Sequence, residues 1–161
     1  MRLKTYDYNQ VGEYFITICT HLKVCLFGDI VNGEMHLNRF GEIVASTWND
    51  LIKHIDGIEL GQFVVMPNHV HGIIIIIDRT VSGAGLEPAP TPPNLSEIVR
   101  QFKTFTARRI NTLRSTPGES VWQRSYWDHI IRNDKSRRQI GEYIINNPAK
   151  WGEDRLFSEK W

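Results

Sequence analysis

Residues 66–77, "MPNHVHGIIIII", place two histidines at the start of an unbroken run of five isoleucines. A short run of β-branched residues is typical of a buried strand. Strand side chains alternate between the two faces of a sheet, so His69 and His71 share one face with Ile73, and Val70 points to the other. A strand core rarely holds side chains that titrate near neutrality. The two histidines are therefore either buried and hydrogen-bonded, or they converge on something that needs two imidazoles.

The neighbouring segments predict the partners of this strand. The stretch "IELGQFVVM" at 58–66 is separated from the histidine strand by Pro67-Asn68 alone. Two residues are too few for a helical crossover, so these two strands should pair antiparallel. We expect further main strands at 13–20 and 125–132, and a small hairpin around Asn32-Gly33, a dipeptide that favours a type I′ turn.

Three helices are predicted from capping residues and helical spacing. Asn38 should cap a helix at about 39–54, whose expected buried stripe comprises Phe40, Ile43, Val44, Trp48, Leu51 and Ile52. Asn94 with Glu97 resembles a capping box that opens a helix to about Leu113. Asn133 or Asp134 should cap a last helix that Pro148 ends.

The order of these elements predicts the fold. It reads β, α, β, β, α, β, with an early hairpin and an extra C-terminal helix, which is the α+β, ferredoxin-like (split βαβ) pattern of an antiparallel sheet. The two crossover helices should cover one face, and the extra helix should cover part of the other. We expect one domain over residues 1–161, with a flexible insertion at about 78–94 that is rich in proline, glycine and alanine.

Composition and charge restrict the function classes. The chain has 161 residues, two cysteines and no apolar stretch of the roughly 20 residues that a membrane span requires, so we expect a cytoplasmic protein without a disulfide scaffold. The net charge is +1, but residues 95–141 hold ten basic and four acidic side chains among several aromatic ones, which suits single-stranded nucleic acid as well as an ordinary solvated helix face. The candidate DNA contacts are Arg100, Lys103, Arg108, Arg124, Arg132, Arg137 and Arg138.

The last predicted helix presents a second set of polar groups. Ile140, Tyr143, Ile144 and Asn147 follow the i, i+3, i+4, i+7 spacing of one helix face. If this face meets the histidines, two imidazoles, an amide oxygen and a phenol lie close together. Such nitrogen and oxygen donors suit Mg²⁺ or Mn²⁺, and a phenol beside the ion is equipped to attack phosphorus. Alternatively, the tyrosine belongs to the core and the asparagine caps the helix.

Two stretches resemble a known family. The stretch "VVMPNHVHGIIII" resembles the histidine–hydrophobe–histidine strand of the HUH nucleases, and "WQRSYWDHIIR" followed by "EYIINNP" resembles the C-terminal signature of single-tyrosine transposases, above all their REP-associated branch. The resemblance runs from about Tyr14 to Pro148. It implies that Tyr143 is the nucleophile and that His69, His71 and Asn147 bind the metal, although bacterial insertion-sequence relatives typically carry glutamine at the last of these positions.

The same resemblance implies a reaction and its partners. The expected substrate is single-stranded DNA with a hairpin, cleaved and rejoined through a 5′-phosphotyrosine intermediate with a divalent metal ion, Mg²⁺ or Mn²⁺. The protein is expected to be a monomer or homodimer, free of membranes and associated with the bacterial nucleoid. Alternation places His129 and Asp128 on opposite faces of their strand, and His129 is the expected neighbour of DNA or metal.

Three other functions share parts of this sequence pattern. An RNA-recognition module shares the fold but needs an aromatic strand motif that is absent from the sequence. A metal-dependent hydrolase barrel also uses paired histidines but needs roughly 250 residues. A protein of the same fold that binds hairpin DNA or RNA without cutting it remains the alternative.

Overall fold

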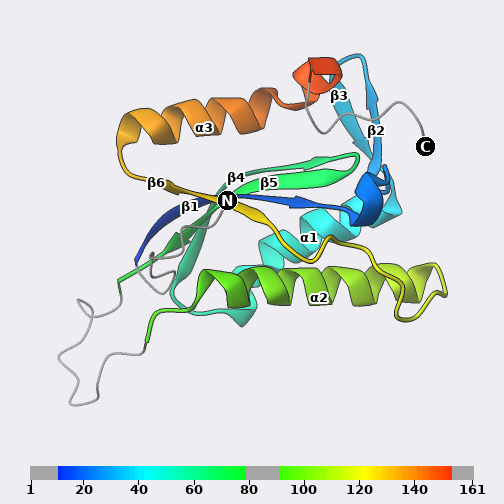
Figure 1. Ribbon diagram of the computed structural model, residues 1–161, viewed down its shortest axis with the longest axis horizontal. Helices are drawn as coiled ribbons and strands as arrows, with labels where there is room; N and C mark the ends of the chain where they lie inside the picture. Colours follow the sequence, from blue (N-terminus) through cyan, green and yellow to red (C-terminus); the bar gives the residue numbers. More distant parts are fainter. Residues whose placement is uncertain (1–10, 79–90, 154–161) are drawn as a thin grey trace.

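The computed structural model describes residues 11–78 and 91–153. Its main sheet has four antiparallel strands in the order β4-β5-β1-β6, and these strands are β1 (Gly12–Cys19), β4 (Ile58–Met66), β5 (His69–Ile76) and β6 (Trp127–Ile131) (Figure 1). This order places the first strand of the chain beside the last and confirms the predicted ferredoxin-like sheet. Most of the predicted insertion, residues 79–90, lies outside the described residues.

Helices cover both faces of the sheet. The helices α1 (Arg39–His54) and α2 (Leu95–Leu113) lie on one face, and α3 (Asp134–Asn146) lies on the other (Figure 1). The smaller elements are the hairpin strands β2 (Gly28–Val31) and β3 (Glu34–Leu37) and the 3₁₀ segments η1 (His21–Lys23) and η2 (Pro148–Glu153). Within the described stretches, no helix combines the length and apolar character needed to cross a bilayer.

Local sequence signals explain where these elements begin and turn. Asn38, Asn94 and Asn133 each accept a hydrogen bond from a backbone N–H in the first turn of the following helix, as predicted for N-caps. Asn32 and Gly33 have φ angles of 53° and 77°, which is the type I′ turn expected between β2 and β3.

Two details of the helices differ from the predictions. The capping box at α2 is incomplete, because the Glu97 carboxylate accepts a hydrogen bond from Arg100 Nε at 2.8 Å. Ile52 was predicted in the buried stripe of α1 but is 53% exposed. It follows the buried Leu51, and one residue along a helix turns the side chain by about 100°, away from the buried stripe.

The two faces of the sheet have cores of unequal size. The large core lies between the sheet and the helices α1 and α2, and includes Tyr14, Trp48, Val70, Ile74 and Phe102. Under α3 there is a smaller cluster, the α3 cluster, whose buried members are Ile73, Ile131 and Ile144. The histidine face therefore carries little hydrophobic packing, which leaves room on it for polar groups.

Gly72 makes the close packing of the larger core possible, and its replacement tests that packing. The Trp48 ring stacks on Phe63 with centroids 4.2 Å apart, and a Cβ added at Gly72 would lie 2.5 Å from Trp48 Cη2. Because Trp48 is only 2% exposed, the ring has nowhere to move. We expect Gly72→Ala to lower the free energy of unfolding by about 1–3 kcal/mol, measured by urea denaturation. Gly152→Ala is the matched control, since a Cβ there meets nothing within 4 Å; an unchanged midpoint for Gly72→Ala would refute the account.

Candidate active site

The paired histidines lie at the start of β5 on the face covered by α3. His69 and His71 are 0% and 1% exposed. Their Nε2 atoms are 3.1 Å apart, and their rings are inclined at 72° with centroids separated by 4.6 Å. The two imidazoles thus point their outer nitrogens at one another within the protein.

Asn68 determines the orientation of His69. Its Nδ2 donates to the Lys23 carbonyl at 3.3 Å, which fixes the rotation of the amide. Its Oδ1 therefore faces His69 Nδ1, 2.8 Å away, and accepts the N–H of that nitrogen. In the neutral imidazole the lone pair is then on Nε2, the atom that faces His71.

Thr17 holds His71 in a similar way. It lies opposite His71 in the register of β1 and β5, and its Oγ1 is 2.7 Å from His71 Nδ1. A hydroxyl can donate or accept, so two arrangements are possible. Either Thr17 donates and His71 Nε2–H bonds to His69, or His71 Nδ1–H donates and both Nε2 lone pairs are directed toward a shared cation. The second arrangement is that of metal-binding histidines whose other nitrogen is held by a hydrogen bond.

Tyr143, on α3, lies over the histidine strand. Its ring centroid is 5.3 Å from that of His71 and 6.1 Å from that of Phe15, against which it packs edge-on. The residue is nevertheless 45% exposed. The phenol is therefore next to the imidazoles and open to solvent at the same time.

Asn147 ends α3 one turn after Tyr143. It is 4% exposed, and its Oδ1 is buried without a hydrogen-bond partner. Four residues later, the Trp151 ring stacks 6.1 Å from His69. Asn147 is thus bracketed in sequence by two residues that contact the histidine pair. A buried acceptor without a partner costs about 1–3 kcal/mol, and such an atom calls for an explanation such as an ion.

The candidate metal ligands include no carboxylate and no thiolate. No group of three or more His, Cys, Asp or Glu side chains gathers as a metal site in residues 11–78 and 91–153. The candidate set is therefore two imidazole nitrogens and one amide oxygen, which matches a borderline-hard divalent ion with open coordination positions.

The predicted basic DNA contacts do not all lie on the histidine face of the sheet. Three of them have protein partners: Arg137 Nε donates to Glu13 at 2.7 Å, Arg100 pairs with Glu97, and Lys103 Nζ donates to the backbone carbonyls of Gln123 and Arg124. Residues 100, 103 and 108 are on α2, on the face away from the histidines (Figure 1). The other four predicted contacts, Arg108, Arg124, Arg132 and Arg138, are exposed and form no ion pair with a described residue.

His129 and Asp128 point to opposite sides of β6. His129 is exposed and lies opposite Phe15, whose ring contacts Tyr143, so it is on the histidine face. Asp128 lies opposite Ile16, on the face of α1 and α2, and its Oδ1 is buried without a hydrogen-bond partner. The structure thus places His129, and not Asp128, beside the candidate site.

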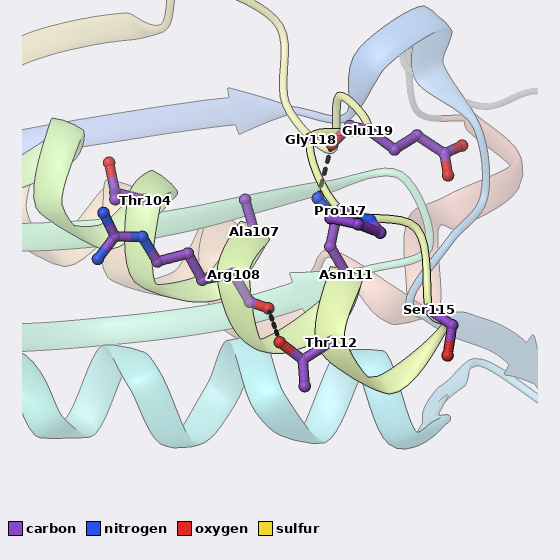
Figure 2. A pocket seen from close by; sticks show the side chains of 9 residues that line it. All are labelled: Thr104, Ala107, Arg108, Asn111, Thr112, Ser115, Pro117, Gly118 and Glu119. Atoms are coloured by element: carbon purple, nitrogen blue, oxygen red, sulfur yellow. Dashed lines mark hydrogen bonds between the residues drawn. The ribbon is translucent and has the colours of Figure 1, made fainter.

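A pocket of about 690 Å³ lies elsewhere, along the C-terminal half of α2 and the loop that follows (Figure 2). Asn111 Nδ2 donates to the Glu119 carbonyl across this loop at 2.8 Å. A second hollow of about 740 Å³, between α1 and α2, shares Arg108 and Thr112 with it. Both belong to the helix layer opposite α3 and are separate from the histidines.

Several residues that shape the site were missed by sequence reasoning. Asn68 and Thr17 orient the imidazoles, while Phe15 and Trp151 pack on Tyr143 and His69. A signal existed for two of them, since the alternation that buries Tyr14 and Ile16 sends Phe15 and Thr17 to the histidine face.

The fold and the site together define a class of protein: a ferredoxin-like α+β domain with paired histidines on a central strand and a tyrosine helix across them. No family model matches the chain. An uncharacterized protein of Haemophilus influenzae is 41% identical over 169 aligned positions, which cover 98% of this chain and 91% of that protein. A second protein of that organism, provisionally named a REP-associated tyrosine transposase, is 24% identical over 91% of this chain and 75% of its own length.

A solved structure shares the fold. The structure of the REP-associated tyrosine transposase bound to a REP hairpin superimposes with a TM-score of 0.65 and 21% identity, covering 96% of this chain and 77% of that one. A REP-associated tyrosine transposase of Escherichia coli is 27% identical over 63% of this chain and 50% of its own length, and these sequence matches support the family of the REP-associated tyrosine transposases.

Proposed function

We propose that this protein cleaves and rejoins single-stranded DNA beside a hairpin, with Tyr143 as the nucleophile. The observation that carries the proposal is the position of the Tyr143 ring, 5.3 Å from that of His71 while 45% of the residue is exposed. A nucleophile that must reach a DNA phosphate needs both properties. The similarity to REP-associated tyrosine transposases and the hairpin bound by the similar solved structure support DNA as the substrate.

The proposed reaction is a reversible exchange of phosphoesters. Tyr143 Oη attacks the phosphorus, the phenolic proton passes to solvent or to a base, and the bond from phosphorus to the 3′-oxygen breaks. The 3′-oxygen takes up a proton and leaves as a hydroxyl, while the 5′-phosphate stays on the tyrosine. Attack by a 3′-hydroxyl on this ester reverses each step, so strands are rejoined without a nucleotide cofactor.

The residues that would hold a metal ion are His69 and His71, through Nε2, and Asn147, through the buried Oδ1. The facing nitrogens and the partnerless amide oxygen fit Mg²⁺ or Mn²⁺. When bound, such an ion polarises the phosphoryl oxygens and offsets the charge that develops on them. Asn68 and Thr17 hold the histidines in place for this role.

A second candidate function, hairpin binding without cleavage, corresponds to the other proton arrangement of the Thr17–His71 contact. If Thr17 donates to His71 Nδ1, the His71 Nε2–H bonds to His69 and the pair is satisfied without a metal. The histidines would then only be structural, in a protein that recognises DNA hairpins.

One experiment distinguishes DNA cleavage from hairpin binding without cleavage. Labelled single-stranded hairpin oligonucleotides, taken from the sequence that flanks the gene, are mixed with the protein in Mg²⁺, Mn²⁺ or EDTA and run on a denaturing gel. We expect an SDS-resistant protein–DNA adduct with metal and none with EDTA. Binding without an adduct in either metal on every hairpin would establish the second function.

Replacing Asn68 tests how the imidazoles are positioned. Asn68→Ala removes the acceptor of His69 Nδ1–H, and loss of such a supporting contact typically weakens metal binding about 10- to 100-fold. We expect a fall of that size in Mn²⁺ affinity, measured by titration calorimetry. Asn68→Asp, which keeps the acceptor oxygen, is the control and should bind Mn²⁺ at least as tightly as the unaltered protein. Equal affinities for the alanine variant and the unaltered protein would mean that Asn68 does not position the ligand.

A further inference from the structure

The edge strand β6 presents ring side chains next to the candidate site. Trp127 is 53% exposed, and the register of the sheet places it opposite Thr17, which in turn lies opposite His71. His129, also exposed, lies in the next row on the same face, opposite Phe15. Trp127 is therefore in the same cross-strand row as one candidate metal ligand.

The helix α3 leaves this part of the sheet open. It packs along β4, where Gly141 meets the amide of Gln62, and at the far end of β6 it covers Ile131. Trp127, at the beginning of β6, remains half exposed. Neighbouring strands are about 4.8 Å apart, so Trp127 is roughly 10 Å from His71 along the sheet. Stacked nucleotides follow one another at about 3.4 Å, so this span corresponds to at most about three of them.

Positive charge flanks the same strand. Arg124 precedes β6 and Arg132 follows it, and both are exposed without an ion pair to any described residue. Aromatic rings between cationic side chains are what single-stranded nucleic acid needs, because bases stack on the rings and phosphates approach the cations. We call the surface made of Trp127 and His129, which Arg124 and Arg132 flank along the chain, the β6 shelf.

We propose that the β6 shelf binds the single strand beside the scissile phosphate, with one base stacked on the Trp127 indole. Trp127 is then a positioning residue, which holds the strand so that the phosphate lies under Tyr143. His129, between Trp127 and the end of β6, is placed to hydrogen-bond the same strand. The inference rests on the proposed function, because that function supplies the location of the DNA. The test of the inference measures DNA binding separately from cleavage.

The test uses hairpin oligonucleotides that carry a single 2-aminopurine at each of three positions on either side of the cleaved bond. Fluorescence is recorded in EDTA for binding, and adduct formation is measured in Mn²⁺. We expect one or two positions to be quenched when the unaltered protein binds. Trp127→Leu, which keeps apolar bulk but has no aromatic face, should abolish that quenching and weaken binding about 5- to 150-fold. Trp127→Phe, the matched variant with an aromatic face, should restore most of both.

An oligonucleotide with an abasic site at the quenched position tests the same contact from the DNA side. Its affinity for the unaltered protein should fall by a factor similar to that seen for Trp127→Leu. In the Trp127→Leu protein, the abasic site should lower the affinity little further. If the abasic site and Trp127→Leu weaken binding by independent factors that multiply, the base does not stack on Trp127. Quenching that persists in Trp127→Leu would likewise contradict the proposed β6 shelf. The absence of an adduct despite Trp127-dependent quenching would overturn the cleavage proposal and leave the shelf standing.

Discussion

Tyr143→Phe is expected to abolish the covalent protein–DNA adduct, with a loss of at least about 10³-fold in the rate of its formation. Phenylalanine keeps the ring that packs edge-on against Phe15 and near His71, and removes only the oxygen that would attack phosphorus. Because the residue is 45% exposed, loss of the hydroxyl should leave the free energy of unfolding within about 0.5 kcal/mol of its original value. The measurement is the rate of SDS-resistant adduct formation in Mn²⁺ on a denaturing gel.

Tyr126→Phe is the matched control for this prediction. Tyr126 is 8% exposed, and its hydroxyl lies 3.2 Å from Ser96 Oγ, so it has a structural environment and little access to DNA. The adduct should still form in this variant. If the adduct survives Tyr143→Phe and is lost in Tyr126→Phe, the nucleophile has been assigned to the wrong residue.

His71→Gln is expected to remove metal-dependent cleavage, by at least about 10²-fold, and to remove the stabilisation that a bound ion provides. The glutamine side chain fills much of the same space and can hydrogen-bond Thr17, but it has no imidazole nitrogen to face His69 Nε2. An ion at about 100 times its dissociation constant stabilises the folded state by about 2.7 kcal/mol. For a domain of this size that corresponds to a rise in Tm of about 5–10 °C.

The rise in Tm with Mn²⁺, relative to EDTA, is measured for three proteins: the unaltered protein, His71→Gln and His36→Gln. His36 is an exposed histidine on β3, outside the site, and its replacement should leave the metal-induced rise intact. The same rise in His71→Gln as in the unaltered protein would show that the ion, if it stabilises the fold, binds elsewhere.

Much of the fold could be predicted because its signals are local. Asn38, Asn94 and Asn133 act as N-caps, and the Asn32-Gly33 turn has the φ angles that its residues favour. The period of two in β5 determined which side the histidines face. The four-residue step from Tyr143 to Asn147 put both on the sheet side of α3, although Tyr143 is more exposed than a core residue.

What the sequence could not predict depends on contacts between distant residues. The role of Asn68 follows from the rotation of its amide, which is fixed by the carbonyl of Lys23, 45 positions away. Arg137 was grouped with the DNA contacts, yet it pairs with Glu13, 124 positions away. A charge pattern records which side chains are basic, but only the fold determines which of them are already neutralised by a carboxylate.

The unequal cores on the two faces of the sheet give the site two parts with different local stabilities. The strand that carries the histidines is enclosed by the large core. The helix α3 instead packs on the smaller α3 cluster, in which only three residues are buried, and is joined to β1 by the Arg137–Glu13 pair at the surface. Sub-global opening takes place where the fewest apolar contacts must be broken. Tyr143 and Asn147 therefore belong to the segment that detaches at the lower free-energy cost, and the imidazoles belong to the segment that opens only when the sheet itself unfolds.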